Sequence, residues 1–386
     1  MQKTKIFHFH NGSGGGVLSI IKNLINYSNN LNIENHVIYT INKSKIKSYT
    51  PEKIVGASSQ QVYYYNSNNN FYYTCSQLAK LLPDSQAIIV AHDWLELGMA
   101  SNLGLQNPVV QFLHGDYSYY YELAKNNEAI INSFVCISSN IYKTLHKHLP
   151  NRKVSIFQRY YPVPTITQNL FNSYNLNLLF AVRDLEDVNK NFQIIPKIDR
   201  LLHKAGIVVK WIIIGKVNTD SKIYSQLNTL KNFKHLFNVP NEALIQILSK
   251  VNIFILPSIN EGLPVALVEA MKAGLVPLVT NWNNATAELL RDGENGFYIE
   301  LDNAKGYAEK IEYLYKNKNI LDNLSQNAAA KANEIFDPHL NTLNIESVIQ
   351  NTITAKYKVA KKVYGSRLDN PLFPNFFVKI LRTFKK

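Results

Sequence analysis

The chain has 386 residues, of which 46% are hydrophobic, so it is long enough for two globular domains of ordinary size. Its 41 basic residues exceed its 28 acidic residues and give a net charge of +13, which favours an anionic partner. The only two cysteines, Cys75 and Cys136, lie far apart in the sequence and lack metal-ligand spacing, which argues against a disulfide framework and a zinc site. The basic residues are spread along the chain without a recognition motif, so we expect no nucleic-acid partner.

The hydrophobic residues do not form a segment that could cross a membrane. No stretch approaches the roughly 18 apolar residues that a spanning helix needs. The opening sequence MQKTKIFHFHNG also lacks the apolar core of a signal peptide. We therefore expect a cytoplasmic protein that is either soluble or attached to the inner face of the cell membrane.

A glycine-rich loop follows the first predicted strand. Residues 6–10 read as a strand, NGSGGG follows, and a helical pattern begins at Val17. Glycines between a strand and a helix let the backbone approach a ligand closely, because no Cβ stands in the way. The spacing is not a dinucleotide fingerprint and no Walker lysine follows, so a simple flexible turn is the alternative.

The rest of the first half alternates strands and helices, which predicts a doubly wound parallel sheet. Further strands are predicted at residues 36–40, 87–91, 109–113 and 134–137. His92 and His114 each follow a predicted strand end, where ligands bind in open parallel sheets. A histidine can exchange a proton near neutral pH, which suits a hydroxyl or a phosphate, whereas the alternative is a histidine that only binds neighbouring backbone. The tyrosine triplet at 63–65 is attributed to composition and assigned to no element.

Two cationic residues follow the first strand of the second half. Pro162 and Pro164 mark a linker, and residues 176–182 read as a strand. Arg183 comes directly after this strand and Lys190 follows seven residues later. Either cation could be an ordinary surface charge.

The most informative stretch, 251–270, reads VNIFILPSINEGLPVALVEA. Residues 253–256 predict a strand buried on both faces, and Pro264 suits the first turn of a helix. Gly274 suits the position just past that helix, and residues 276–280 predict the next strand. A helix N-terminus therefore points into a loop at the carboxyl end of a parallel strand, which favours anions and hydroxyl-rich ligands.

Two carboxylates mark this loop and helix. Glu261 precedes the helix, and Glu269 lies inside it among apolar neighbours, where a carboxylate is costly to bury without partners. In the plainer interpretation, Glu269 faces solvent and pairs with Lys272, while Glu261 is an acidic residue favoured by the helix dipole.

The string PSINEGLPVALVEAMKAGLVPLVT resembles the Glu-x7-Glu signature of retaining glycosyltransferases of the GT-B fold, most closely glycosyltransferase family 4. The resemblance implies that Glu261 lies by the donor sugar and that Glu269 binds the nucleotide ribose. It adds Gly262, Leu263 and Pro264 to the donor-binding set.

The same resemblance assigns roles outside this string. NGSGGG is similar to the family's glycine-rich loop, so Gly14, Gly15 and Gly16 are expected near the donor phosphates. His114 matches the histidine on the acceptor side. Arg183 and Lys190 are expected to neutralise the donor diphosphate, although the usual gap between these cations is five residues.

The resemblance implies an α/β protein with two Rossmann-like doubly wound parallel-sheet domains facing a central cleft. We expect an acceptor-side domain at 1–168, a donor domain at 169–360, and a C-terminal helix at 361–386 that crosses back to the first domain. The implied reaction is retaining hexosyl transfer from a nucleotide sugar to a glycan or lipid-linked acceptor, in bacterial surface polysaccharide synthesis. The sequence contains no Asp-x-Asp triplet, so we expect neither a metal nor another cofactor.

Two other functions use the same fold. A sugar-nucleotide epimerase would need acid and base carboxylates around the sugar, and an inactive homologue would bind the nucleotide sugar without transferring it. The tail FPNFFVKILRTFKK alternates aromatic and basic residues. It is either the closing helix or a membrane-surface anchor, and the two interpretations are compatible.

Overall fold

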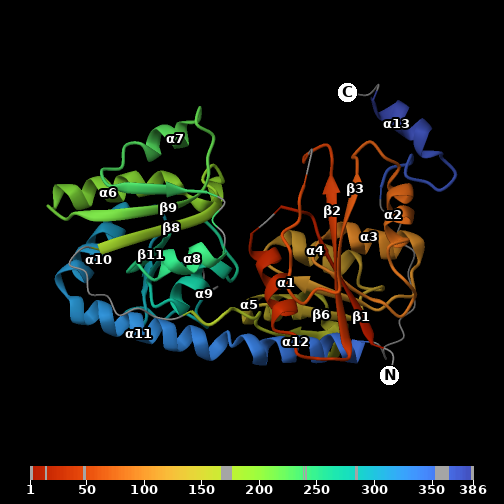
Figure 1. The fold of residues 1–386 in the computed structure, drawn as a ribbon, viewed down its shortest axis with the longest axis horizontal. Coiled ribbons are helices and arrows are strands. Elements are labelled where there is room, and N and C mark those ends of the chain that lie inside the picture. The colour runs from red at the N-terminus through yellow and green to blue at the C-terminus, as the bar shows by residue number, and fades with distance from the viewer. Residues whose placement is uncertain are drawn as a thin grey trace. The chain divides into compact units, whose positions relative to one another are not determined.

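The computed structural model describes residues 3–13, 15–46, 49–166, 176–237, 239, 241–282, 286–352 and 365–383. The chain forms two compact units, of which unit 1 comprises Met1–Pro162 with Pro338–Lys386 and unit 2 comprises Val163–Asp337. Each unit contains a parallel sheet, with helices on both faces (Figure 1). The expected doubly wound α/β class is confirmed for each unit.

Unit 1 is built on a seven-stranded sheet with the order β3-β2-β1-β4-β5-β6-β7, and every neighbouring pair in it is parallel. Its strands are β1 Thr4–His10, β2 Ile33–Asn42, β3 Ser59–Tyr65, β4 Ile88–Ala91, β5 Val109–Leu113, β6 Ser133–Cys136 and β7 Ile156–Gln158. Its helices are α1 Gly16–Asn26, α2 Phe71–Ala79, α3 Trp94–Leu103, α4 Ser118–Asn126, α5 Ser139–His148, the 3-10 helix η1 Pro150–Ser155, α12 Pro338–Asn351 and α13 Asn375–Thr383.

Unit 2 is built on a six-stranded parallel sheet with the order β10-β9-β8-β11-β12-β13. Its strands are β8 Leu176–Asp184, β9 Val209–Lys216, β10 Phe233–Leu236, β11 Ile253–Leu256, β12 Val276–Thr280 and β13 Phe297–Ile299. Its helices are α6 Ile195–Lys204, α7 Lys222–Leu227, α8 Asn241–Leu248, α9 Val265–Lys272, α10 Ala304–Lys316 and α11 Lys318–Ile335, with the 3-10 helices η2 Val188–Lys190 and η3 Phe192–Ile194. Counted along the chain, this is the 3-2-1-4-5-6 order of a dinucleotide-type fold.

The central strands are the ones that the apolar runs predicted. Every residue of β4, β5, β11 and β12 is buried, as expected for parallel strands that helices cover on both faces. The edge strand β3 was missed, because its tyrosines are only partly buried and were attributed to composition. The Tyr63 hydroxyl donates to the carbonyl of Thr74 at 3.0 Å, and the Tyr64 hydroxyl donates to the carbonyl of Tyr49 at 3.1 Å.

The chain returns to unit 1 at Pro338, earlier than the expected boundary at residue 360. Helix α12 packs on unit 1, where the ring of His339 lies edge-on to Tyr27 with the ring centroids 5.0 Å apart. Asn341 donates to the carbonyl of Tyr161 at 3.3 Å. Because Ile345, Val348 and Ile349 of α12 are buried within unit 1, unit 2 ends where α12 begins.

Candidate nucleotide-sugar site

The carboxyl ends of β8 and β11 are neighbours at the centre of unit 2. These strands pair in parallel, and they are the first and fourth strands of the sheet along the chain. Their outgoing connections therefore diverge, which opens a crevice outside the strand ends where such sheets bind ligands. The loop after β8 carries Lys190, and the loop after β11 carries Glu261.

Lys190 and Glu261 form an ion pair across this position. The Lys190 Nζ lies 2.5 Å from Glu261 Oε1, and 71 residues separate the two in sequence. The side chains are 24% and 9% exposed, so the pair is largely shielded from water but still reachable by a ligand. The longer gap after Arg183 does not displace Lys190 from Glu261, because the backbone turns between Asp187 and Lys190, with a 2.9 Å hydrogen bond from the Lys190 amide to the Asp187 carbonyl.

Two asparagines beside Lys190 join the same two loops, and sequence reasoning missed both. The Asn189 side chain accepts from the Asn260 amide at 3.0 Å and donates to the Asn260 carbonyl at 2.8 Å. The Asn189 carbonyl accepts from the Ile259 amide at 2.7 Å. Asn191 adopts a left-handed conformation with φ of 53° and donates to the Pro257 carbonyl at 3.2 Å. The sequence signal was the pair of asparagines flanking Lys190, since asparagine tolerates this conformation.

Helix α9 begins directly after the Glu261 loop. Leu263 is buried and Pro264 occupies the N-cap position, so the first amides of α9 lie next to Gly262 and Glu261 in the chain. Glu269 lies on the second turn of α9 and is half-buried. The motif therefore supplies a carboxylate before the helix and a second one within it, as the sequence predicted.

Lys272 does not form the exposed pair with Glu269 that we considered. Its side chain is fully buried, and its ammonium donates to the carbonyls of Val163 at 2.6 Å and Phe336 at 2.8 Å. Burial lowers the pKa of Lys272 to about 8. The interpretation of Lys272 as a solvent-facing partner is wrong, because the ammonium instead satisfies carbonyls at the two ends of unit 2.

Arg183 occupies the last part of β8 and is exposed. It lies between Ala181 and Asp184, where the pairing register between β8 and β9 shifts. Arg183 therefore belongs to the same strand end as the loop that carries Lys190. Its role at a diphosphate stays a prediction.

The glycine-rich loop lies at the carboxyl end of β1, which pairs with β4 at the centre of unit 1. Gly14 lies outside the described residues. Gly15 is the N-cap of α1 with φ of 91°, a conformation that side-chain-bearing residues rarely adopt, and Gly16 is the first residue of the helix. Asn11 in the same loop donates to the Asp93 carboxylate at 3.0 Å, so the loops after β1 and β4 are joined.

Three histidines form a connected chain at this end of unit 1. His92 Nδ1 lies 2.7 Å from His114 Nε2, and His92 Nε2 lies 3.3 Å from His8 Nδ1. Burial lowers the pKa of His8 to about 4 and that of His114 to about 3, and it holds the pKa of His92 well below its usual value. All three are therefore neutral at pH 7. Sequence reasoning identified His92 and His114 but missed His8, which lies inside a strand.

Neutral imidazoles restrict how this chain is protonated. Each contact needs one N–H and one lone pair. The N–H groups of the three rings must therefore all point the same way along the row of histidines. Among the described residues, the buried Nδ1 of His114 has no hydrogen-bond partner. The row of three histidines therefore ends at His114 in a ring nitrogen that can accept or donate a hydrogen bond.

Residues 165–331 match the family model described as "Glycosyl transferases group 1". Almost all of unit 2, with β8, β11, α9 and the Lys190–Glu261 pair, lies within this range. Unit 2 therefore resembles a group 1 glycosyl transferase domain over nearly its whole length. The matched range thus contains every residue that the sequence assigned to the donor, except the glycine-rich loop.

Curated relatives share parts of the chain. The capsular polysaccharide biosynthesis glycosyltransferase CapM of Staphylococcus aureus is 24% identical over 58% of this chain and 56% of its own length. A Campylobacter jejuni enzyme, named as an N,N'-diacetylbacillosaminyl-diphospho-undecaprenol alpha-1,3-N-acetylgalactosaminyltransferase, is 33% identical over 23% of each chain. The chain thus spans little more than half of the first relative and about a quarter of the second.

Solved structures show the fold of unit 2 together with unit 1. A glycosyltransferase from Rickettsia africae matches with a TM-score of 0.71, at 14% identity, over 92% of this chain and 100% of its own. Anabaena HepE in complex with UDP and glucose matches with a TM-score of 0.70, at 14% identity, over 90% and 99%. The predicted GT-B fold, with two Rossmann-like units, is confirmed.

Proposed function

We propose that the chain is a glycosyltransferase that moves a hexose from a nucleotide sugar to a glycan or glycolipid acceptor, with retention of anomeric configuration. The observation that carries the proposal is the Lys190–Glu261 pair. It lies where the connections after β8 and β11 diverge in a 3-2-1-4-5-6 sheet, within the range that matches the group 1 glycosyl transferase model. The UDP and glucose named for HepE support a nucleotide-sugar donor. The names of the Staphylococcus and Campylobacter relatives support surface polysaccharide synthesis and a lipid-linked acceptor.

The donor diphosphate would lie at the loops after β8 and β11. There the Lys190 ammonium neutralises phosphate charge while Glu261 holds the lysine in position, and Arg183 supplies a second cation. The first amides of α9 add a site for anions at a helix N-terminus. Glu269, half-buried on the same helix, accepts hydrogen bonds from the ribose hydroxyls.

The transfer breaks the bond between the anomeric carbon and the diphosphate oxygen. The acceptor hydroxyl oxygen bonds to the anomeric carbon on the same face, and its proton passes to the departing diphosphate. Negative charge grows on that leaving group, so fixed cations aimed at it lower the barrier. In this proposal Lys190 and Arg183 do the work of a metal ion, and no other cofactor takes part.

The acceptor would bind unit 1 near His114. The neutral imidazole of His114 lies at the carboxyl end of β5, where ligands bind in open parallel sheets. A lipid-linked acceptor would place the enzyme at the inner face of the cell membrane. The described part of the chain contains no helix long and apolar enough to cross a bilayer, so this association would be peripheral.

The donor site is tested by titration calorimetry with UDP, GDP, ADP, CMP and dTDP, in EDTA and in magnesium. One nucleotide should bind with equal affinity in both buffers. Lys190→Met should weaken that binding about ten- to hundredfold, because a hydrogen bond between charged groups contributes about 1.5–3 kcal/mol. Lys197→Met removes an exposed lysine of α6 in the same unit and should bind like the wild type. Equal affinity of the two variants would refute the site, and binding only in magnesium would refute metal independence.

The reaction is tested with the sugar nucleotide that binds. Anomeric proton NMR of the first product should show the configuration of the donor, and an inverted product would refute retention. If the sugar nucleotide were converted to its epimer in the absence of an acceptor, the protein would instead be an epimerase. Binding without turnover, across lipid-linked and free glycan acceptors, would identify an inactive homologue.

A further inference from the structure

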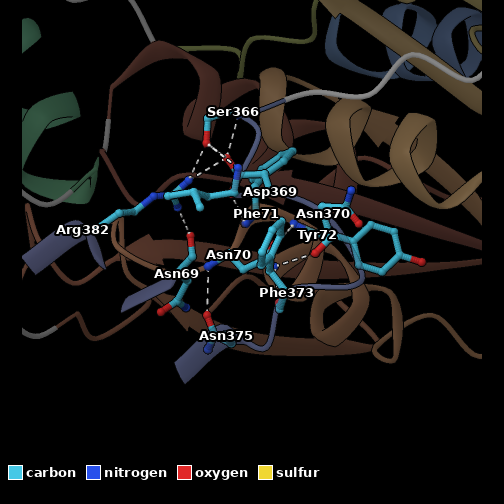
Figure 2. A network of polar contacts seen from close by, with 11 residues as sticks. Asn69, Asn70, Phe71, Tyr72, Ser366, Asp369, Asn370, Phe373, Asn375 and Arg382 are labelled. Atoms are coloured by element: carbon cyan, nitrogen blue, oxygen red, sulfur yellow. Dashed lines mark hydrogen bonds and ion pairs between the residues drawn. The ribbon is translucent and has the colours of Figure 1, made fainter. Parts of the chain in front are cut away.

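The C-terminal segment 365–383 contacts the rest of unit 1 through the buried carboxylate of Asp369. Asp369 is 5% exposed and accepts from the Phe71 amide at 2.6 Å and from the Ser366 amide at 2.8 Å (Figure 2). It also accepts from the Ser366 hydroxyl at 3.0 Å and from Arg382 of α13 at 2.7 Å. Burial opposes ionisation of Asp369, but the ion pair and the hydrogen bonds outweigh it and lower the pKa of this carboxyl. The segment is therefore held by a charge that remains ionised near neutral pH.

Asn70, in the loop before α2, also attaches the C-terminal segment to unit 1. Its side chain donates to the carbonyls of Asn370 at 2.9 Å and Phe373 at 2.8 Å, and its amide donates to the Asn375 side chain at 2.9 Å (Figure 2). Asn70 is 1% exposed and its side chain also caps α2 through the Tyr72 amide. These contacts fix both the position and the rotation of α13 on unit 1.

Helix α13 is amphipathic, but its apolar side faces away from the protein. Val378 is fully buried, and Arg382, one turn later, makes the ion pair with Asp369. At about 100° per residue, the four large apolar side chains lie on an arc of about 140° on the opposite side of the helix. These residues, which we call the outer face, are Phe376, Phe377, Ile380 and Leu381, with exposures of 68%, 59%, 36% and 49%.

Two apolar residues shortly before the helix are also exposed. Leu372 is 84% exposed and Phe373 is 44% exposed. A surface helix of a globular protein normally buries its apolar side against the core and presents its charges to water. Contiguous exposed apolar patches of this kind mark interaction sites.

The chemistry around the outer face favours a bilayer as its occupant. Lys379 is exposed beside it, and the whole chain carries a charge of +13. Basic residues next to embedded aromatic and aliphatic side chains are typical of helices that lie in the headgroup region of anionic membranes. A nine-residue helix is only about 13 Å long. It is too short to cross a bilayer or to supply the roughly 1,200 Å² that a stable dimer buries.

We propose that the outer face of α13, together with the exposed Leu372 and Phe373 that precede the helix, binds the surface of an anionic lipid bilayer. The inference deepens the peripheral membrane association of the proposed function by naming its surface, and it does not depend on sugar transfer. The Asp369–Arg382 pair and Asn70 hold the helix so that its apolar side chains enter the membrane while unit 1 stays in water.

The test is flotation of the full chain with vesicles of phosphatidylcholine alone or with 30% phosphatidylglycerol. The wild type should float with the anionic vesicles and bind several-fold less to the neutral ones. The double variant Phe376→Gln with Phe377→Gln should lower the partition coefficient about a hundredfold, because two large apolar side chains no longer enter the membrane. Lys379→Gln should lower it about fivefold at low salt. Both phenylalanines are exposed, so thermal unfolding of the double variant should match the wild type.

The matched control is Leu340→Gln with Leu343→Gln, which removes two exposed leucines of α12 in the same unit and should float like the wild type. Equal flotation of the phenylalanine variant and the wild type would overturn the proposal. Absence of wild-type binding to either vesicle would also overturn it. So would a dimer that forms in solution and is broken by the phenylalanine variant. Nucleotide titration of the same proteins separates the two proposals, since failure of the donor site would leave vesicle binding intact.

Discussion

The buried histidines of unit 1 should make the protein sensitive to acid in a way that one substitution can reduce. His8 is 1% exposed and contacts His92. Burial, and to a smaller extent the nearby His36, lower its pKa to about 4, while a hydrogen bond with Asn35 acts in the opposite direction. The unfolded chain protonates this ring near pH 6.5. The folded state resists protonation, so stability from His8 is complete above pH 6.5 and is lost as the pH falls towards 4.

The size of the loss follows from the two pKa values. The gap between 6.5 and about 4 corresponds to about 3.4 kcal/mol once the ring is protonated in both states. At pH 5 the loss is about 2 kcal/mol, compared with about 0.2 kcal/mol at pH 7. A domain is typically stable by about 5–15 kcal/mol, so a single ring accounts for a measurable fraction.

We expect His8→Leu to reduce the drop in unfolding free energy between pH 7 and pH 5 by about 2 kcal/mol. The comparison of pH differences cancels any change in stability that the substitution causes at pH 7. Cys75 and Cys136 provide a probe specific to unit 1, because they are the only cysteines of the chain and both are fully buried. Their reaction with 4,4′-dithiodipyridine, which proceeds at acid pH, reports unfolding of unit 1 along a urea series.

His203→Leu is the matched control, since His203 is exposed on α6 of unit 2. This variant should keep the full wild-type difference between pH 7 and pH 5. If His8→Leu showed the same difference as the wild type, the buried histidine would not be the source of acid sensitivity, and the reasoning would be refuted.

Three further substitutions test buried polar groups. Arg152→Met should lower stability by about 3 kcal/mol in urea unfolding, because the buried guanidinium donates to three loop carbonyl groups, and the exposed Lys153→Met should have little effect. Burial lowers the pKa of Lys272 to about 8, so stability should rise by about 2 kcal/mol between pH 8 and pH 10 as the folded state is relieved of a buried charge. That rise should be absent from Lys272→Met, and an equal rise in both proteins would contradict it. Trp211→Phe should cost about 2 kcal/mol, because it removes the 2.9 Å hydrogen bond to the buried Asp199, and a change below 0.5 kcal/mol would argue against it.

Much of unit 2 was predictable because its signals are local. The apolar run at 253–256 forms β11, Pro264 caps α9, and Gly274, with φ of 83°, follows its end. These outcomes depend on backbone preferences of neighbouring residues and on burial of short apolar runs. The same local reasoning failed for the tyrosines at 63–65, since an edge strand is only half buried and its pattern is weak.

The sequence by itself determined the alternation of strands and helices, the central strands, the carboxylates of the Glu-x7-Glu string and the cations after β8. Only the tertiary structure decided which of these residues meet. Lys190 contacts Glu261 across 71 residues, and Asn189 joins the same loops, because the sheet order places β8 beside β11. Contacts of this kind depend on sheet order and loop path, which periodicity along the chain does not encode. The outward rotation of α13 has the same origin, since its amphipathic pattern is visible in the sequence but the contacts of Asp369 and Asn70 decide which side faces water.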